Sequence, residues 1–145
     1  MQTSLPARAT LGFLAGALAV LTFHQGMWAL LHSLNLPDMA MPAPFPMRPI
    51  PPFQVPQTFN LCFWGGMYGV VFGAFWPAYR GVGWVAGLVT GLIASVICIM
   101  IVPVIKGFPP GAGWHIANWA RAFLINGTWG VGLGVIYPLI QRVKS

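Results

Sequence analysis

The sequence predicts an all-α integral membrane protein with four transmembrane helices. Of its 145 residues, 57% are hydrophobic and only 6% are charged, whereas a soluble domain carries about 25% charged residues. The charged residues leave four uncharged segments, at 9–37, 49–79, 81–105 and 122–141. Each segment can supply the roughly 20 apolar residues that cross a bilayer.

Polar and proline-rich ends narrow these segments to spans at Ala9–Leu31, Phe59–Tyr79, Trp84–Val104 and Ala117–Ile140. The first span begins after Arg8, as a signal peptide would, but its apolar run continues to Leu31. A signal peptide has an apolar region of only about 7–15 residues, so we expect a retained helix. Residues 1–145 are expected to form a single transmembrane domain, with a Pro/Met-rich external loop at 33–58.

The basic residues indicate the topology. One side of the membrane is expected to hold Arg8, Arg80, Arg142 and Lys144, and the other Arg48, Lys106 and Arg121. Because Lys and Arg are more frequent on the cytoplasmic side, both termini are expected in the cytoplasm, most simply at a bacterial inner membrane. The net charge of +6 is therefore interpreted as a topology signal, and no nucleic-acid partner is expected.

An internal repeat organises the predicted spans. A shift of 61 residues pairs five residues of the second span with identical residues of the fourth: Gly66, Gly69, Val70, Gly73 and Pro77 with Gly127, Gly130, Val131, Gly134 and Pro138. At another shift, Gly12 and Gly16 match Gly87 and Gly91. These matches predict a tandem repeat of a two-helix hairpin, with a pseudo-twofold axis along the membrane normal. Both repeated prolines are expected to bend or end their helices.

Small residues four apart mark one face of each span. Such positions stay on one side of a helix, and they let two helix backbones approach closely in a bilayer. They therefore predict a compact four-helix bundle. The glycines assigned to helix packing are Gly12, Gly16, Gly65, Gly69, Gly73, Gly83, Gly87, Gly91, Gly130 and Gly134.

Four polar residues inside the predicted spans are candidates for function, namely His24, Gln25, Asn60 and Asn126. Polar and ionisable side chains are costly in a membrane and usually face an interior or a cavity. His24 could also be a haem ligand. A b-type haem normally uses two histidines on facing helices, and His32 lies on the same predicted helix. A hydrogen-bonded structural role for His24 is the favoured interpretation, and the sequence requires no cofactor.

Asp38 is the only acidic residue in the chain. Paired-carboxylate catalysis is therefore excluded, and the intramembrane carboxylate typical of proton-coupled carriers is absent. We assign no catalytic residue and no metal site, and an enzymatic role is disfavoured. At the ends of the spans, Arg121, Trp114 and Trp119 are predicted to lie at the membrane interface or against lipid headgroups.

These features favour a small accessory or assembly subunit of a larger membrane complex. The glycine faces and the proline-rich loop are expected to dock on a partner, which is another membrane-protein subunit or a copy of the chain, within the lipid bilayer. A second hypothesis is a small homo-oligomeric channel or carrier, with the polar residues lining its path. A third is a membrane redox protein that binds haem or quinone near His24.

Overall fold

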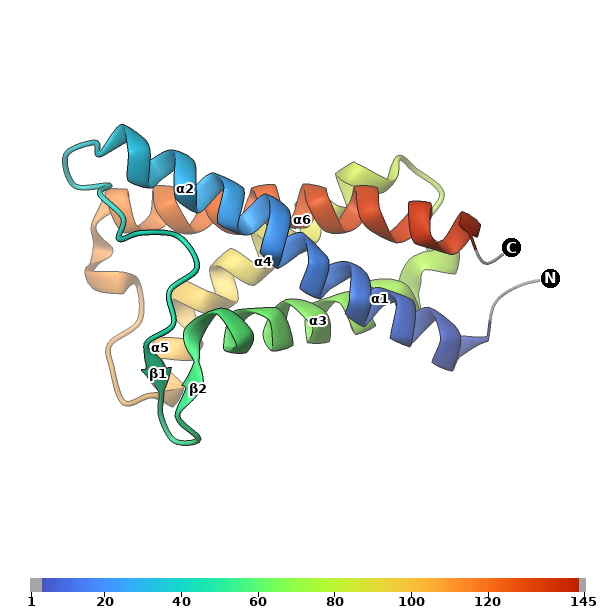
Figure 1. Ribbon diagram of the computed structural model, residues 1–145, viewed down its shortest axis with the longest axis horizontal. Coiled ribbons are helices and arrows are strands. Elements are labelled where there is room, and N and C mark those ends of the chain that lie inside the picture. The colour runs from blue at the N-terminus through green and yellow to red at the C-terminus, as the bar shows by residue number, and fades with distance from the viewer. Residues whose placement is uncertain (1–3, 144–145) are drawn as a thin grey trace.

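The computed structural model describes residues 4–143, and Lys144 of the predicted topology lies outside them. Four helices form a bundle (Figure 1), and each is long and apolar enough to cross a membrane. These four candidate spans are Leu5–Leu34, Gln57–Ala78, Gly83–Ile105 and Ile116–Val143. The prediction of four helices that are apolar and long enough to cross a membrane is therefore confirmed. The first helix is longer than expected, because it extends beyond the predicted span at both ends.

The first span changes its winding in the middle. It consists of α1 (Leu5–Ala19), a π-helical turn η1 (Val20–His24) and α2 (Gln25–Leu34). Within the π-helical turn, the Thr22 hydroxyl donates a hydrogen bond of 2.8 Å to the Leu18 carbonyl oxygen, an interaction that competes with the regular backbone ladder. Two polar residues that are adjacent in sequence, His24 and Gln25, are both buried at the end of this turn. Hydrophobic spacing did not predict the π-helical turn.

The remaining elements follow an up-and-down order. Helix α3 (Gln57–Phe75) leads into a 3-10 turn, η2 (Trp76–Ala78), which contains Pro77. Then come α4 (Gly83–Met100), the short helix α5 (Val102–Ile105), a second 3-10 turn, η3 (Ala112–Trp114), and α6 (Ile116–Val143). Pro138 lies inside α6, which continues to Val143. Of the two expected effects, bending or ending the helix, ending is therefore wrong for Pro138.

Glycines bring α1 and α3 into backbone contact. A Cβ atom at Gly12 would overlap the carbonyl oxygen of Gly69, and a Cβ atom at Gly16 would overlap that of Gly65. The same close approach continues to Gly73, where a Cβ atom would overlap a backbone oxygen of α1. Only glycine fits these positions without moving the helices apart.

Helices α4 and α6 make an equivalent contact. A Cβ atom at Gly87 would overlap the carbonyl oxygen of Gly130, and a Cβ atom at Gly91 would overlap that of Asn126. At Gly83, an added Cβ atom would lie 2.5 Å from the carbonyl oxygen of Gly134. The bundle therefore contains two tightly packed helix pairs, α1 with α3 and α4 with α6.

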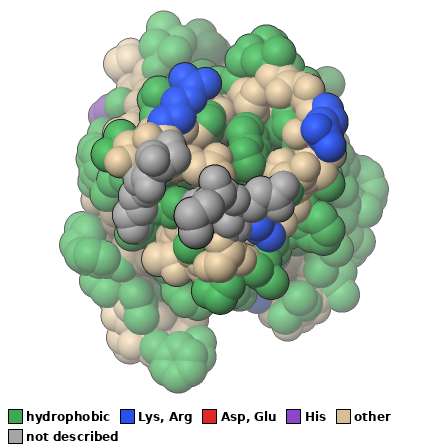
Figure 2. All heavy atoms as spheres, turned by 90° about the vertical axis from the view of Figure 1, so that its right-hand side faces the viewer, with side chains coloured by type: hydrophobic (Ala, Val, Ile, Leu, Met, Phe, Trp, Pro, Cys, Tyr) green, Lys and Arg blue, Asp and Glu red, His purple; other side chains and the backbone are tan. Residues whose placement is uncertain are grey.

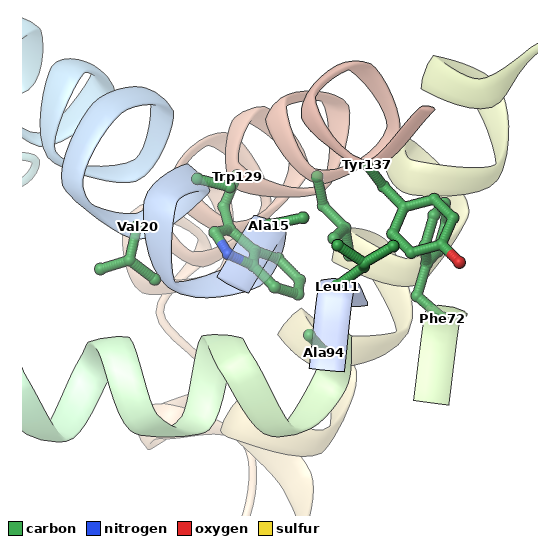
Figure 3. Close-up of a cluster of buried hydrophobic side chains, with 9 residues drawn as sticks. Leu11, Ala15, Val20, Phe72, Ala94, Trp129 and Tyr137 are labelled. Atoms are coloured by element: carbon green, nitrogen blue, oxygen red, sulfur yellow. The ribbon is translucent and has the colours of Figure 1, made fainter. Parts of the chain in front are cut away.

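Larger side chains fill the space between the two pairs (Figure 3). Trp129 of α6 is 2% exposed, and its indole N–H donates a hydrogen bond of 3.0 Å to the Gly16 carbonyl oxygen of α1. The ring of Tyr137 packs edge-on against that of Phe72, with 5.6 Å between the ring centroids. Leu133 and Tyr137 are fully buried. Aromatic and aliphatic packing thus joins the glycine-based pairs into one core.

The two ends of the bundle differ. Figure 1 places both chain ends at the same end of the bundle, and Figure 2 shows Lys and Arg side chains on that face. Arg8, Arg80 and Arg142 belong to this end, because they lie in the first turn of α1, between α3 and α4, and in the last turn of α6. The opposite end carries the long connection between α2 and α3, together with the turns between α5 and α6.

Candidate functional site

The connection from α2 to α3, residues 35–56, is here called the arm. It begins at Asn35, whose left-handed backbone (φ 44°) ends α2 while its N–H donates to the Leu31 carbonyl oxygen. Farther along, β1 (Pro49–Ile50) pairs with β2 (Val55–Pro56) in an antiparallel hairpin. The sequence predicted a Pro/Met-rich external loop here but neither the hairpin nor the path of the arm over the bundle.

Three side chains of the first span bind the backbone of the arm. The indole N–H of Trp28 donates to the Pro42 carbonyl oxygen at 2.9 Å. His32 Nδ1 lies 2.7 Å from the Met41 carbonyl oxygen, and because a carbonyl only accepts, this nitrogen must carry the hydrogen. Gln25 accepts a 2.7 Å hydrogen bond at Oε1 from the backbone N–H of Phe45. The arm therefore runs back along α2.

Helices α3 and α6 bind the arm as well. The Thr58 hydroxyl and the Thr58 backbone N–H both donate to the Pro46 carbonyl oxygen, at 2.8 Å and 3.0 Å. From α6, the Arg121 guanidinium donates to the Ala40 carbonyl oxygen at 3.2 Å, and it also contacts the Asn118 side-chain oxygen. The arm is thus attached to three of the four spans.

His24 and Gln25 form a buried polar pair beneath the arm. They are 6% and 1% exposed. Because the Phe45 N–H donates to Gln25 Oε1, the Gln25 amide nitrogen faces His24 Nδ1, at 3.5 Å. This geometry makes His24 Nδ1 the acceptor and places its ring hydrogen on Nε2. The imidazole also packs against the Trp28 ring, with 5.9 Å between the centroids.

The other two polar candidates are on different helices. Asn126 of α6 donates a hydrogen bond of 3.1 Å to the Ala122 carbonyl oxygen of its own helix, and Asn60 is half-buried on α3. His32 of the first span is engaged with the arm rather than with His24. Among residues 4–143, no group of three or more His, Cys, Asp and Glu side chains is placed to hold a metal ion.

The predicted interface residues lie at the end of the bundle that carries the arm (Figure 1). Trp114 and Trp119 stack with 5.8 Å between their ring centroids, and Trp114 is 67% exposed. The indole N–H of Trp119 donates to the Gly111 carbonyl oxygen at 2.9 Å. Arg121 contacts the arm through Ala40, a role that the sequence did not suggest, because the two residues are far apart in the chain.

An apolar groove of about 400 Å³ lies between α1, the arm and α3. Its lining comprises Leu14, Ala17, Leu18, Leu21, Phe45, Met47, Thr58, Phe59 and Cys62. None of the four polar candidates is in this lining. Sequence reasoning missed the groove because its walls come from three segments whose contact depends on the path of the arm.

The outward-facing side chains are large and apolar. On α3, a stripe with a spacing of four residues is exposed: Phe59, Phe63, Met67, Val71 and Phe75. On the arm, Met47 is 56% exposed, and Phe53 is 85% exposed near the turn of the hairpin. The glycine faces, in contrast, are covered from within the chain.

Comparison of the chain with protein-family models, curated proteins and solved structures gives no match. The function proposed for the chain therefore rests on its own residues and their geometry.

Proposed function

We propose that the chain is an accessory or assembly subunit of a larger membrane complex, and that it docks on a partner subunit through the arm. The observation that carries this proposal is the combination of a fixed arm backbone with an exposed aromatic tip. Side chains of three spans bind the arm, yet Phe53 is 85% exposed. A surface that is already ordered loses little conformational entropy on binding.

The docking surface extends to the outer face of α3. The glycines that the sequence suggested for docking are occupied by packing inside the chain, so a partner must use other residues. The exposed stripe from Phe59 to Phe75 provides large apolar side chains for contact with another transmembrane helix. In a bilayer, the gain from such a contact comes from van der Waals packing rather than from removal of water.

We also propose that the two helix pairs are copies of one hairpin. A shift of 75 residues for the first helix and of 61 for the second converts the Gly12–Gly69 contact into the Gly87–Gly130 contact. The same shifts convert the Gly16 contact with Gly65 into the Gly91 contact with Asn126. This correspondence supports a tandem duplication. The basic residues at the terminal end support cytoplasmic termini in a bacterial inner membrane.

The test is affinity purification of the tagged chain from its own membranes in mild detergent, followed by native electrophoresis. The wild-type chain is expected to migrate with larger membrane subunits. Phe53→Ser is expected to lose these subunits without losing thermal stability, because the Phe53 ring is almost fully exposed. Phe108→Ser is the matched control: Phe108 is 66% exposed at the same end of the bundle but outside the arm.

Other results of this purification would refute the proposal. A homo-oligomer of the chain alone would instead support a small channel or carrier, provided that Phe53→Ser leaves the oligomer intact. A Soret absorbance band that disappears in His24→Ala would support a haem-binding redox protein. Equal loss of partner subunits in Phe53→Ser and Phe108→Ser would show that the arm is not the docking element.

A further inference from the structure

The groove between α1, the arm and α3 has the chemistry of an acyl-chain site. Eight of its nine lining side chains are apolar or a thiol, and the exception, Thr58, donates its hydroxyl hydrogen to the Pro46 carbonyl oxygen. Water needs several polar partners to be stable in a cavity, and this lining offers few. An apolar occupant is therefore favoured over water.

The position of the groove along the helices indicates which kind of apolar molecule can reach it. Leu14 to Leu21 belong to the first membrane-spanning helix, and Phe59 and Cys62 belong to the first two turns of the second. The groove thus lies on the side of the spanning segments and toward the end that carries the arm. With the four helices in a bilayer, it opens to the acyl chains of the leaflet on that side.

The arm fixes the end of the groove. The Phe45 backbone N–H is held by the fully buried Gln25 side chain, and the neighbouring Pro46 carbonyl oxygen is held by Thr58. These bonds hold the backbone from which the Phe45 and Met47 side chains reach the groove. The groove is therefore preformed, which lowers the entropic cost of binding an acyl chain.

A cation lies next to the groove. Arg48 follows Met47, and its Nε–H donates a hydrogen bond of 2.6 Å to Oε1 of Gln57, the residue before Thr58. This bond holds the guanidinium at the start of α3, and the chain neighbours of the two bonded residues, Met47 and Thr58, line the groove. Arginine suits a phosphate particularly well, because its planar N–H groups can bind two oxygens together. The single acidic residue of the chain, Asp38, precedes this part of the arm by ten residues.

From the apolar lining, the preformed end and the adjacent cation, we propose that this groove binds an anionic phospholipid. One acyl chain occupies the groove, and the headgroup phosphate binds the Arg48 guanidinium. The groove shares Phe59 with the stripe proposed for docking, but the inference concerns the isolated chain in lipid, so it can be tested without a partner subunit.

The two cysteines allow a direct test. Both are free; Cys62 lines the groove, and Cys98 lies exposed on α4 outside it. The purified chain in detergent is treated with N-ethylmaleimide, with either dioleoyl phosphatidylglycerol or dioleoyl phosphatidylcholine added, and alkylation at each cysteine is followed by peptide mass spectrometry. Phosphatidylglycerol is expected to slow alkylation of Cys62 about five-fold more than phosphatidylcholine, the effect of one basic residue on an anionic lipid. Alkylation of Cys98 is expected to be equal in the two lipids.

Two substitutions assign the effect to the cation. Arg48→Gln, which keeps a partner for Gln57, is expected to abolish the difference between the lipids at Cys62, whereas Lys106→Gln, at the same end of the bundle, is expected to preserve it. Ala17→Phe fills the groove and should reduce the phosphatidylglycerol retained in native mass spectrometry. The proposal is overturned if the two lipids protect Cys62 equally in the wild-type chain, or if Lys106→Gln has the same effect as Arg48→Gln.

Discussion

Gly12→Ala should destabilise the bundle, whereas Gly26→Ala should not. Both glycines belong to the first membrane-spanning helix. A Cβ atom at Gly12 would overlap the carbonyl oxygen of Gly69 and lie 3.3 Å from the Gly73 nitrogen, whereas a Cβ atom at Gly26 would meet nothing within 4 Å. The two substitutions add the same methyl group and differ only in what that group contacts.

The size of the effect follows from the atoms involved. The obstructing atoms at Gly12 belong to the backbone of α3, so no side-chain rotation can relieve the overlap. Carbon and oxygen atoms in ordinary contact lie about 3.5 Å apart, which requires the helices to separate by more than about 1 Å. Overpacking of this kind lowers the free energy of unfolding by about 1–3 kcal/mol, and we expect the upper part of that range.

Thermal unfolding in detergent, followed by the loss of the monodisperse size-exclusion peak, measures the difference. About 1 kcal/mol corresponds to a change in Tm of roughly 2–4 °C for a chain of this length, so Gly12→Ala should lower Tm by roughly 5–10 °C. Gly26→Ala should leave Tm unchanged or raise it slightly, because alanine favours the helix. Equal Tm values for the two variants would refute a backbone contact between α1 and α3.

Three further substitutions test the arm and the core. Gln25→Leu removes the acceptor of the Phe45 N–H, so hydrogen exchange at the Phe45 amide should become at least about ten-fold faster, with unchanged exchange in α4 as the control. Trp129→Phe removes the buried hydrogen bond to Gly16 and should cost about 1–2 kcal/mol in thermal unfolding; no loss would mean that this bond is not formed in detergent. Asn35→Ala should cost about 1 kcal/mol in thermal unfolding, because the residue has a φ of 44° and a left-handed backbone is unfavourable for residues with a Cβ atom, whereas Asn35→Gly should be tolerated.

The four spans could be predicted because charged side chains are costly in a bilayer, so long uncharged stretches of the sequence identify the helices that can cross it. No charged residue lies between Arg8 and Asp38, and most of the first helix, from residue 9 to Leu34, falls in this interval. The pairing of Gly12 with Gly69 and of Gly87 with Gly130 follows a second simple rule, since small residues four apart form a flat face. Both rules depend on residue type and spacing alone.

The arm could not be predicted, because its path depends on single hydrogen bonds between distant residues. The Phe45 N–H donates a hydrogen bond to Gln25, whereas the carbonyl oxygens of the arm accept hydrogen bonds: that of Pro46 from Thr58, and that of Ala40 from Arg121. Prolines remove backbone N–H donors from this segment. It therefore forms no regular secondary structure along most of its length, and its sequence shows no hydrophobic repeat from which its position could be predicted. The polar character of Gln25 indicated that it must find a partner, but not that the partner is an amide of the arm.

The division of contacts within the bundle explains why function falls to the arm and the outer surfaces. Within each helix pair, backbone contacts between glycines occupy the faces at which another helix could approach most closely. Between the pairs, Trp129 and Tyr137 fill the remaining interior and are almost fully buried. What is left for recognition is a surface of large apolar side chains and an ordered arm. Phe53, which is exposed, and Phe45, which lines the groove, come from this one arm, so the hydrogen bonds at Gln25, Thr58 and Arg121 hold the backbone of both proposed binding surfaces together.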